Sequence, residues 1–277
     1  ETATTVIYTV TLHDALPISK ADGITLDLLP TKCWILGLGN LGQALLWILG
    51  LVPFADPGEV LLVLQDMDIS AAENLDVQIL TQFGWIGHKK ARVAAEWAEA
   101  RGFRTVVTER PFTDATRRLA EEPGLIFAGV DNLPTRRSAA RAEAGFDLVI
   151  DAGLGATAAE AFDIRLHAFP GFRDPKIAWP EPLKEAERPL TPALSKLVEE
   201  GRLDRCGALV IAGLSVGVPS TAVAAAAIQV AQACRAILTS SYCDLVDASL
   251  VDTRRAAAHD ATLRRAGILP SQRARRR

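Results

Sequence analysis

WILGLGNLGQALLWILG, residues 34–50, joins a short apolar run to a run whose apolar residues recur at helical spacing. Three glycines, Gly37, Gly39 and Gly42, form a G-x-G-x-x-G pattern between the two runs. The first permits a tight turn, the second lets a phosphate approach the backbone, and the third lets helix and strand pack closely. The stretch therefore predicts a strand, a nucleotide-binding turn and a helix. Because NAD-, FAD- and ATP-binding folds all use such turns, the pattern alone does not identify the nucleotide.

Apolar runs alternate with helical patterns along the next part of the chain. Strands are predicted at 32–39, 59–68, 103–110, 124–131, 146–155 and 161–171, and helices at 40–52, 88–102, 113–122 and 135–145. This order predicts an α/β fold, a doubly wound, mostly parallel, Rossmann-like sheet with helices on both faces. Ligands of such sheets bind beyond the carboxyl ends of the strands, where the glycine turn, Asp66, Asp68 and Asp131 are expected.

Composition sets the broad class of protein. The chain has 277 residues, 49% of them hydrophobic, and a formal net charge of -3, so we expect a globular protein without general attraction to nucleic acid. Four cysteines, at positions 33, 206, 234 and 243, form no C-x-x-C pair. A structural zinc site and a disulfide framework are therefore not expected, which fits the reducing cytoplasm. Cys33 and Cys234 lie in apolar runs and are expected in the core.

Three further segments need an interpretation. LHDALPIS, residues 12–19, matches the conceptual translation of a sequencing-library adapter, so residues 1–19 are expected to be an artefact and not native. The apolar stretch 207–238 is long enough to cross a membrane, but it contains Pro219 and several polar residues, so a buried helix of a soluble domain is favoured. Residues 254–277 predict a solvated helix with a frayed end, the last part (261–277) being a basic tail. The alternative for that tail is an arm that binds nucleic acid or a membrane.

The stretch QDMDISAAENLDVQILTQFGWIGHKKARVAAE, residues 65–96, distinguishes between the nucleotides. It resembles the ThiF/MoeB/HesA superfamily of adenylyltransferases, bacterial relatives of ubiquitin-activating enzymes. The matching elements are Asp66-Met67-Asp68, Asn74-Leu75, Gln78, Ile86-Gly87 and Lys90. GVDNLPTRRSAA, residues 129–140, resembles the Asp-Asn-x-x-x-Arg segment of the same superfamily. The resemblance covers residues 30–170 well and implies one adenylation domain over residues 20–260.

The resemblance implies a reaction as well as a fold. In the superfamily, the C-terminal carboxylate of a small ubiquitin-like or sulfur-carrier protein attacks the α-phosphate of ATP, with Mg²⁺, to give an acyl-adenylate and pyrophosphate. By this resemblance, Asp66 would hold the ribose, Asn74 and Lys90 the phosphates, and Asp131 the Mg²⁺. The domain would pair as a homodimer, with no nucleic-acid or membrane partner. A structural alternative exists for each side chain, because Lys90 could be a solvated helix charge, and Asn74 and Asp131 could be helix caps.

Two departures from the superfamily make this a divergent member. Val77 stands where the superfamily has an arginine, which Arg92, Lys89 or an arginine of the native N-terminal segment could replace, and the paired C-x-x-C motifs are missing. Cys206, in DRCGA before the long apolar helix, is a candidate thiol for thioester formation, since nearby arginines and a helix N-terminus lower a thiol pKa. The alternative for Cys206 is a small buried residue.

Two other functions stay open at this point. A non-catalytic partner subunit that keeps the fold for binding is favoured by Val77. An NAD(P)-dependent oxidoreductase is the other, but it has no need for Lys90 and Asn74 beside the phosphates.

Overall fold

The computed structural model describes residues 28–155, 157–180, 190–202, 217–263 and 269–273. Its main feature is one eight-stranded sheet of order β4-β3-β2-β5-β6-β7-β8-β9. The strands are β2 (Lys32–Leu36), β3 (Leu61–Gln65), β4 (Arg104–Thr108), β5 (Leu125–Ala128), β6 (Leu148–Leu154), β7 (Asp163–Phe169), β8 (Ser241–Ser249) and β9 (Ala256–Thr262). Strands β2 to β6 run parallel, whereas β7, β8 and β9 are antiparallel additions. The predicted mostly parallel α/β fold is confirmed.

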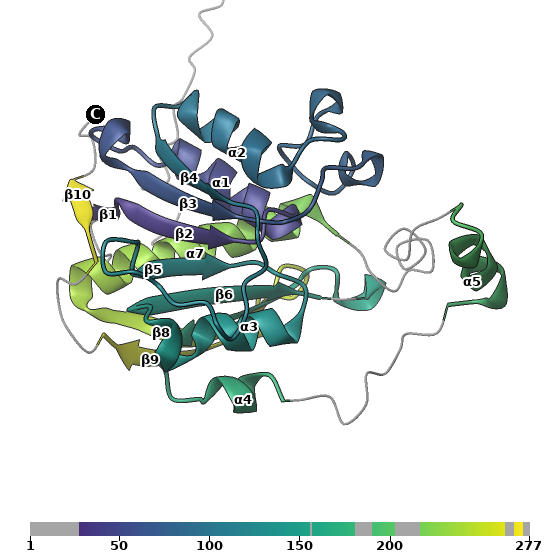
Figure 1. The fold of residues 1–277 in the computed structure, drawn as a ribbon. Coiled ribbons are helices and arrows are strands. Elements are labelled where there is room, and N and C mark those ends of the chain that lie inside the picture. Colours follow the sequence, from purple (N-terminus) through teal and green to yellow (C-terminus); the bar gives the residue numbers. More distant parts are fainter. Residues whose placement is uncertain (1–27, 156, 181–189, 203–216, 264–268, 274–277) are drawn as a thin grey trace, which may run out of the picture.

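The strand order places a switch in winding direction at β2. From β2 the chain winds outward through β3 to β4 and then returns to the other side of β2 to form β5 and β6 (Figure 1). In doubly wound sheets, ligands bind in the crevice at this switch point. The glycine turn that follows β2 therefore lies where the fold itself favours a ligand.

Helices cover both faces of the sheet (Figure 1). They are α1 (Asn40–Leu51), α2 (Lys90–Glu99), α3 (Leu133–Ala140), α4 (Pro175–Ala178), α5 (Pro192–Glu199) and α7 (Pro219–Thr239). Short 3₁₀ helices lie at Pro57–Glu59, Ala72–Asn74, Phe83–Trp85, Ala142–Ala144 and Ala158–Glu160. Side chains of α1, α2 and α7 form one core with alternate strand residues such as Ile35 and Phe127. The strand residues between them, such as Trp34 and Ile126, form a second core with α3.

Helix α7 accounts for the described part of the apolar stretch 207–238. It is long and apolar enough to cross a membrane by length and composition, but half of its most apolar window is buried inside the fold. It packs against α1, and the amide of Gln229 donates to backbone oxygens of β5 and β6 at 3.3 and 2.9 Å. The expectation of a core helix is confirmed for these residues.

The structure corrects two local expectations. Residues 113–122 form turns and not the expected helix, because groups from elsewhere in the chain occupy the backbone groups that a helix would pair. In a helix the N–H of Arg118 would donate to Asp114 O, but it donates to Ala144 O at 2.9 Å, and Asp114 O accepts from Arg141. Residues 256–262, expected in a solvated helix, form β9, since β8 offers them a paired edge that outweighs the helix preference of alanine. In addition, β10 (Ser271–Arg273), inside the segment 261–277, pairs with β1 (Leu28–Pro30).

Candidate functional site

The glycine turn after β2 has the geometry that a phosphate requires. Gly37 has a φ of +87°, which L side chains rarely adopt, and its N–H donates to Gln65 O at 2.9 Å. A Cβ on Gly42 would lie 1.8 Å from Gly37 O, so only glycine lets α1 approach the turn this closely. Around Gly39, in contrast, a Cβ would meet nothing within 4 Å, and no side chain caps the N-terminus of α1. The turn therefore presents uncapped helix N–H groups next to open space.

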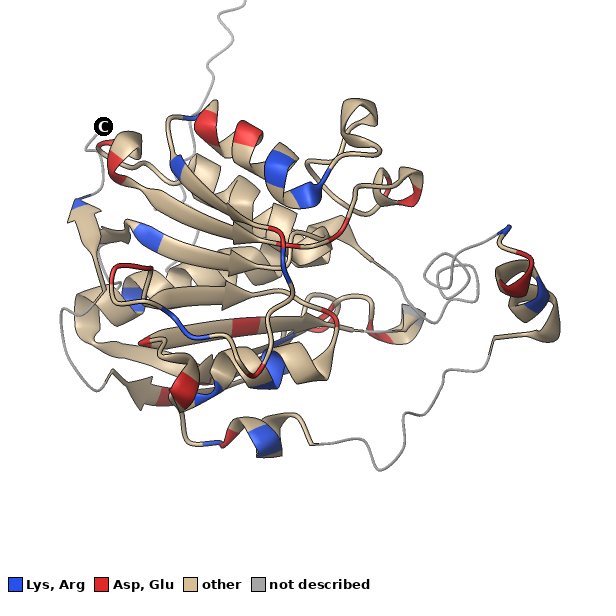
Figure 2. Cartoon of the chain, viewed as in Figure 1, with Lys and Arg blue, Asp and Glu red and all other residues tan. Residues whose placement is uncertain are grey.

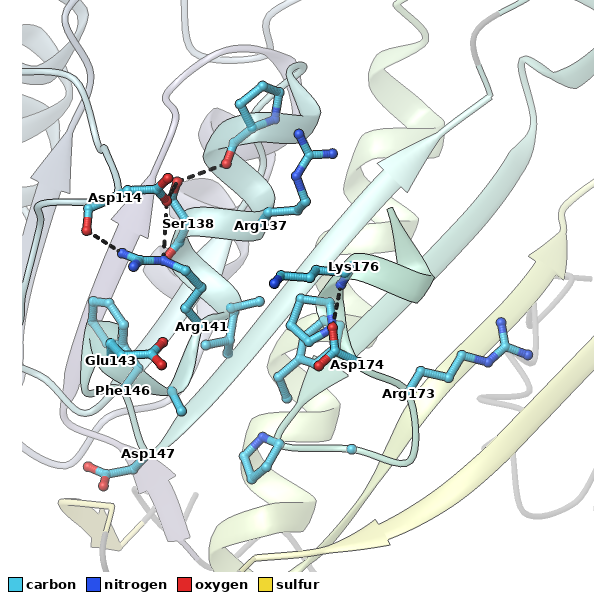
Figure 3. Close-up of a pocket in the computed structure, with 18 of the residues that line it drawn as sticks. Asp114, Arg137, Ser138, Arg141, Glu143, Phe146, Asp147, Arg173, Asp174 and Lys176 are labelled. Atoms are coloured by element: carbon cyan, nitrogen blue, oxygen red, sulfur yellow. Dashed lines mark hydrogen bonds and ion pairs between the residues drawn. The ribbon is translucent and has the colours of Figure 1, made fainter. Parts of the chain in front are cut away.

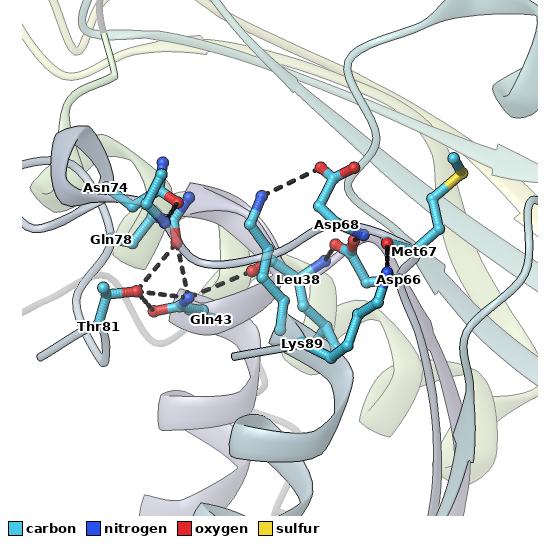
Figure 4. Close-up of polar contacts among 11 residues, drawn as sticks. Leu38, Gln43, Asp66, Met67, Asp68, Asn74, Gln78, Thr81 and Lys89 are labelled. Carbon is cyan, nitrogen blue, oxygen red and sulfur yellow. Dashed lines mark hydrogen bonds and ion pairs between the residues drawn. The ribbon is translucent and has the colours of Figure 1, made fainter. Parts of the chain in front are cut away.

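Asp66, at the end of β3, holds the turn in place. Its two carboxylate oxygens accept from Leu38 N at 2.6 Å and from Asp68 N at 2.7 Å, as Figure 4 illustrates. Asp66 thus links the turn to the loop after β3. Carboxylate oxygens can accept more than one hydrogen bond each, so the expected ribose contact stays compatible with this geometry and remains a prediction.

A buried amide cluster, which the sequence did not indicate, supports the same turn from the other side (Figure 4). Gln43, 1% exposed, donates from Nε2 towards Leu38 O (3.2 Å), Gln78 Oε1 (2.8 Å) and Thr81 Oγ1 (2.9 Å). Its Oε1 accepts from Leu80 N at 3.0 Å. The amide cluster, Gln43, Gln78 and Thr81, therefore joins the glycine turn to the segment after Asn74. Gln78 was expected as a motif residue, but its role emerges only from this contact.

Lys90 lies at the first position of α2 and is only 8% exposed. Its Nζ lies 3.1 Å from Asp68 Oδ2, and the Asp68 side chain is 61% exposed. Figure 2 shows the basic residues of α2 (Lys90, Arg92) at its N-terminal end and the acidic ones (Glu96, Glu99) towards its other end. This order opposes the helix macrodipole, which favours anions at the N-terminus. Lys90 is therefore a buried cation and not the solvated helix charge that was the alternative.

Asn74 and Val77 lie on the segment that the amide cluster anchors. Asn74 Oδ1 accepts from Ala71 N at 3.0 Å, so this side chain caps a short 3₁₀ helix, as its structural alternative proposed. The phosphate contact expected of Asn74 remains a prediction. Val77 lies against the backbone before α7, because a Cβ on Gly217 would be 3.2 Å from Val77 Cβ. The position that carries an arginine in the superfamily is thus an apolar contact here.

Asp131 follows β5 and is exposed at the same edge of the sheet. It does not cap α3, because Asn132 Oδ1 accepts from Thr135 N at 2.9 Å and takes that role. The neighbouring Val130 lies against the glycine turn, 2.9 Å from where a Cβ on Gly37 would be. Asp131 is therefore placed close to the turn, and its exposed carboxylate makes no hydrogen bond or ion pair with the described residues.

Beneath Asp131, a buried ion pair fixes the start of α3. Arg136 Nη1 lies 3.1 Å from Asp151 Oδ2, and Arg136 Nε donates to Val130 O at 2.8 Å. Asp151 is fully buried in β6, and one of its oxygens lacks a partner within the described structure. Burial raises the pKa of Asp151 to about 6 although Arg136 opposes the shift.

A pH-dependent stability effect follows from Asp151. A carboxyl whose pKa rises from 3.8 to about 6 on folding stabilises the fold below pH 3.8 and loses that contribution as the pH rises through 6. The stability of Asp151→Asn relative to the wild type should therefore rise by about 2 kcal/mol between pH 4 and pH 7.5. Urea unfolding of both proteins at the two pH values measures this difference. A difference that is independent of pH would contradict the assigned burial effect.

The cysteines divide between core and undescribed segments. Cys33 and Cys234 are 0% and 2% exposed, and burial raises the pKa of both thiols, so their expected place in the core is confirmed. Cys206 lies outside the described residues, and its role remains a prediction. Among the described residues, no cluster of three or more His, Cys, Asp or Glu side chains could hold a metal ion by itself.

Comparison with known proteins assigns the family. Residues 29–240 match the BilD C-terminal domain family. The chain belongs to this family. A curated relative, the bacterial E1-like protein BilD of Collimonas sp. (strain OK412), is 39% identical over 212 residues, which cover 76% of this chain and 45% of that protein. The chain thus spans less than half the length of this relative.

Solved structures support the fold of this BilD-family domain. E. coli MccB alone and E. coli MccB with succinimide each give a TM-score of 0.50, with 15% and 14% identity. Each match covers 86% of this chain, and 64% and 66% of the respective MccB chain. These structures show the fold, whereas the expected relationship to activating enzymes is supported by the BilD family, whose curated member is described as an E1-like protein. The finer ThiF/MoeB assignment remains a hypothesis.

A cavity of about 930 Å³ in this BilD-family domain lies away from the glycine turn, between α3 and the loop after β7 (Figure 3). Most of the charged side chains that line this cavity pair with one another, with other side chains or with backbone groups. Arg141 lies 3.2 Å from Asp114, and Arg137 donates to Trp179 O at 3.0 Å. None of the side chains predicted to bind the nucleotide lines it. The candidate site is therefore the edge formed by the glycine turn, Asp66, Lys90 and Asp131.

Proposed function

We propose that this domain binds ATP at the glycine turn and adenylates the C-terminal carboxylate of a small ubiquitin-like or sulfur-carrier protein. Lys90 carries this proposal. It is a buried cation at the end of a helix where the macrodipole favours anions, and its described counter-ion is the largely solvated Asp68. Because Asp68 is largely solvated, it balances the buried charge of Lys90 only in part, and a nucleotide phosphate is an anion that this arrangement fits.

The reaction joins two anions, so the site has to balance negative charge. A carboxylate oxygen of the carrier protein forms a bond to the α-phosphorus, the bond from that phosphorus to the bridging oxygen breaks, and pyrophosphate leaves. Lys90 and the N–H groups at the start of α1 would balance the charge that develops on the phosphate oxygens. Before the substrate arrives, Asp66 and the amide cluster hold the turn that leads into α1, and Asp68 holds Lys90.

Asp131 fits the expected contact with Mg²⁺. Its exposed carboxylate, without a partner in the described part of the chain, is a hard oxygen ligand close to the turn. Protein sites for Mg²⁺ commonly supply one or two carboxylates and leave the other positions to phosphate oxygens and water. When bound, the ion would supply positive charge that offsets the charge of the phosphates. In this hypothesis Asp131 holds the ion and Lys90 holds the phosphate.

Two parts of the proposal extend beyond the nucleotide. Thioester formation at Cys206 and assembly as a homodimer remain hypotheses that rest on the resemblance. The second candidate function, a non-catalytic partner subunit, is favoured by Val77, because an apolar contact with Gly217 replaces the expected arginine. The two functions differ in whether the domain turns ATP over in the presence of its carrier protein.

The choice of nucleotide is tested by binding. We expect isothermal titration to give at least about 10-fold tighter binding of ATP with Mg²⁺ than of NAD. The reason is that Lys90 offers a cation to the triphosphate of ATP, which carries more negative charge than the diphosphate of NAD. Removing Mg²⁺ should weaken ATP binding and leave NAD binding unchanged. Tighter binding of NAD, with ATP binding indifferent to Mg²⁺, would favour the oxidoreductase instead.

A further inference from the structure

The peptide group between Leu38 and Gly39 is held at its carbonyl end by the amide cluster. Gln43 Nε2 donates to Leu38 O at 3.2 Å, while the backbone N–H of Gln43 donates to Gly39 O at 3.0 Å. On the other side of the same residue, Leu38 N donates to Asp66 Oδ2. The backbone of Leu38 is thus fixed by one side chain from α1 and one from the end of β3.

Fixing this carbonyl also fixes the N–H of Gly39. A trans peptide is planar, and its C=O and N–H bonds point in opposite directions. Because Leu38 O is directed to the buried amide of Gln43, the N–H of Gly39 is directed away from it. Gly39 N makes no hydrogen bond within the described residues, and a Cβ on Gly39 would meet no atom within 4 Å.

The amide of Gln43 has a single orientation that satisfies its surroundings. Leu80 N can only donate, and it faces Oε1 at 3.0 Å, whereas Leu38 O can only accept, and it faces Nε2. A flipped amide would set two donors against each other at Leu80 and two acceptors at Leu38. Burial makes such unpaired groups costly, so Gln43 is held in the orientation that donates to Leu38.

We propose that Gln43 is a positioning residue, whose amide holds the Leu38 carbonyl so that the N–H of Gly39 faces a phosphate of the bound nucleotide. This inference rests on the proposed function, since it needs a nucleotide at the turn. Thr81 belongs to the same amide cluster but makes no contact with Leu38 O, because its hydroxyl bonds only Gln43 and Gln78. Thr81 therefore offers a matched control from the same cluster.

The test compares Gln43→Met with Thr81→Val, using ATP and adenosine as the two probes. Methionine keeps the length and volume of Gln43 but cannot donate to Leu38 O. We expect Gln43→Met to weaken ATP binding by about 10- to 100-fold, the range of a lost hydrogen bond to a charged group, and adenosine binding by less than about 2-fold. Thr81→Val should keep the wild-type ratio of the two affinities. NMR titration measures both, including weak binding of adenosine.

The outcomes separate the inference from the proposed function. Equal losses of ATP and adenosine affinity in Gln43→Met would overturn the inference alone, because Gln43 would then support only the fold of the site. Failure of the wild-type protein to bind ATP would overturn the proposed function and this inference with it. If Gln43→Met does not fold, the wild-type ¹⁵N spectrum decides. The Gly39 amide signal should shift with ATP and not with adenosine, and an unmoved Gly39 signal in the ATP-bound protein would overturn the inference.

Discussion

Replacing Lys90 by methionine is expected to lower ATP–pyrophosphate exchange, measured with the carrier protein present, by about 10²- to 10³-fold. The lost group is a cation that is 8% exposed and lies 3.1 Å from Asp68. Because little of Lys90 reaches water, its attraction to a phosphate is stronger than that of a fully solvated lysine, and the cation is in place before the reaction begins. Methionine keeps the apolar stem of Lys90 and therefore the packing around it.

The stability of Lys90→Met should stay the same or increase, in contrast to its activity. Removing a buried cation from the N-terminus of α2 relieves an unfavourable interaction with the macrodipole, and the exposed Asp68 stays solvated without its partner. Thermal unfolding should therefore give a melting temperature for Lys90→Met equal to or above that of the wild type. This opposition of activity and stability distinguishes a functional lysine from a structural one.

A lysine at the opposite end of the parallel strands supplies the control. Lys32 begins β2 at the amino end of the strand, away from the glycine turn, and Lys32→Ala should exchange at the wild-type rate. Exchange by Lys90→Met at the wild-type rate would remove Lys90 from the site. No exchange in the wild type, with the correct carrier, would favour the non-catalytic partner subunit.

The parallel half of the sheet was predictable from sequence because each element carried its own signal. Near-continuous apolar runs indicated buried strands, and polar residues directly after them indicated one common edge. Asp66 and Asp131 do lie at that edge after β3 and β5. The G-x-G-x-x-G spacing predicted a contact between turn and helix, which the close approach of Gly42 to Gly37 O confirms.

The features that could not be predicted from sequence depend on contacts between distant parts of the chain. The turn at 113–122 is held by groups far along the sequence, such as Arg141, which a helical pattern cannot reveal. Strand β9 is rich in alanine and pairs only because β8 lies beside it. Gln43 appears in sequence as a polar residue in an apolar helix, and its importance comes from Leu38, Gln78 and Thr81 around it.

Replacing Gly42 by alanine is expected to destabilise the domain by more than about 4 kcal/mol, the range reached only by severe core changes. The added Cβ would lie 1.8 Å from Gly37 O and 2.8 Å from Gly37 C, so the backbone itself has to move. Gly37 cannot yield easily, because its N–H is bonded to Gln65 O at the end of β3 and its φ is +87°. Urea unfolding, or loss of soluble protein where the variant does not fold, measures the effect.

Gly39→Ala is the matched comparison, because it adds the same methyl group two positions from Gly37. Gly39 has an extended backbone, with φ -78° and ψ -152° and so without the positive φ of Gly37, and the new Cβ would meet no protein atom within 4 Å. Its stability should therefore stay within about 1 kcal/mol of the wild type, the usual cost of alanine at a helix N-cap. The methyl group would instead occupy the space assigned to a phosphate, so ATP affinity should fall although the fold is intact. If Gly42→Ala is as stable as the wild type, α1 does not approach the turn as closely as the distance of 1.8 Å implies. If Gly39→Ala binds ATP as tightly as the wild type, the phosphate does not bind on this side of the turn.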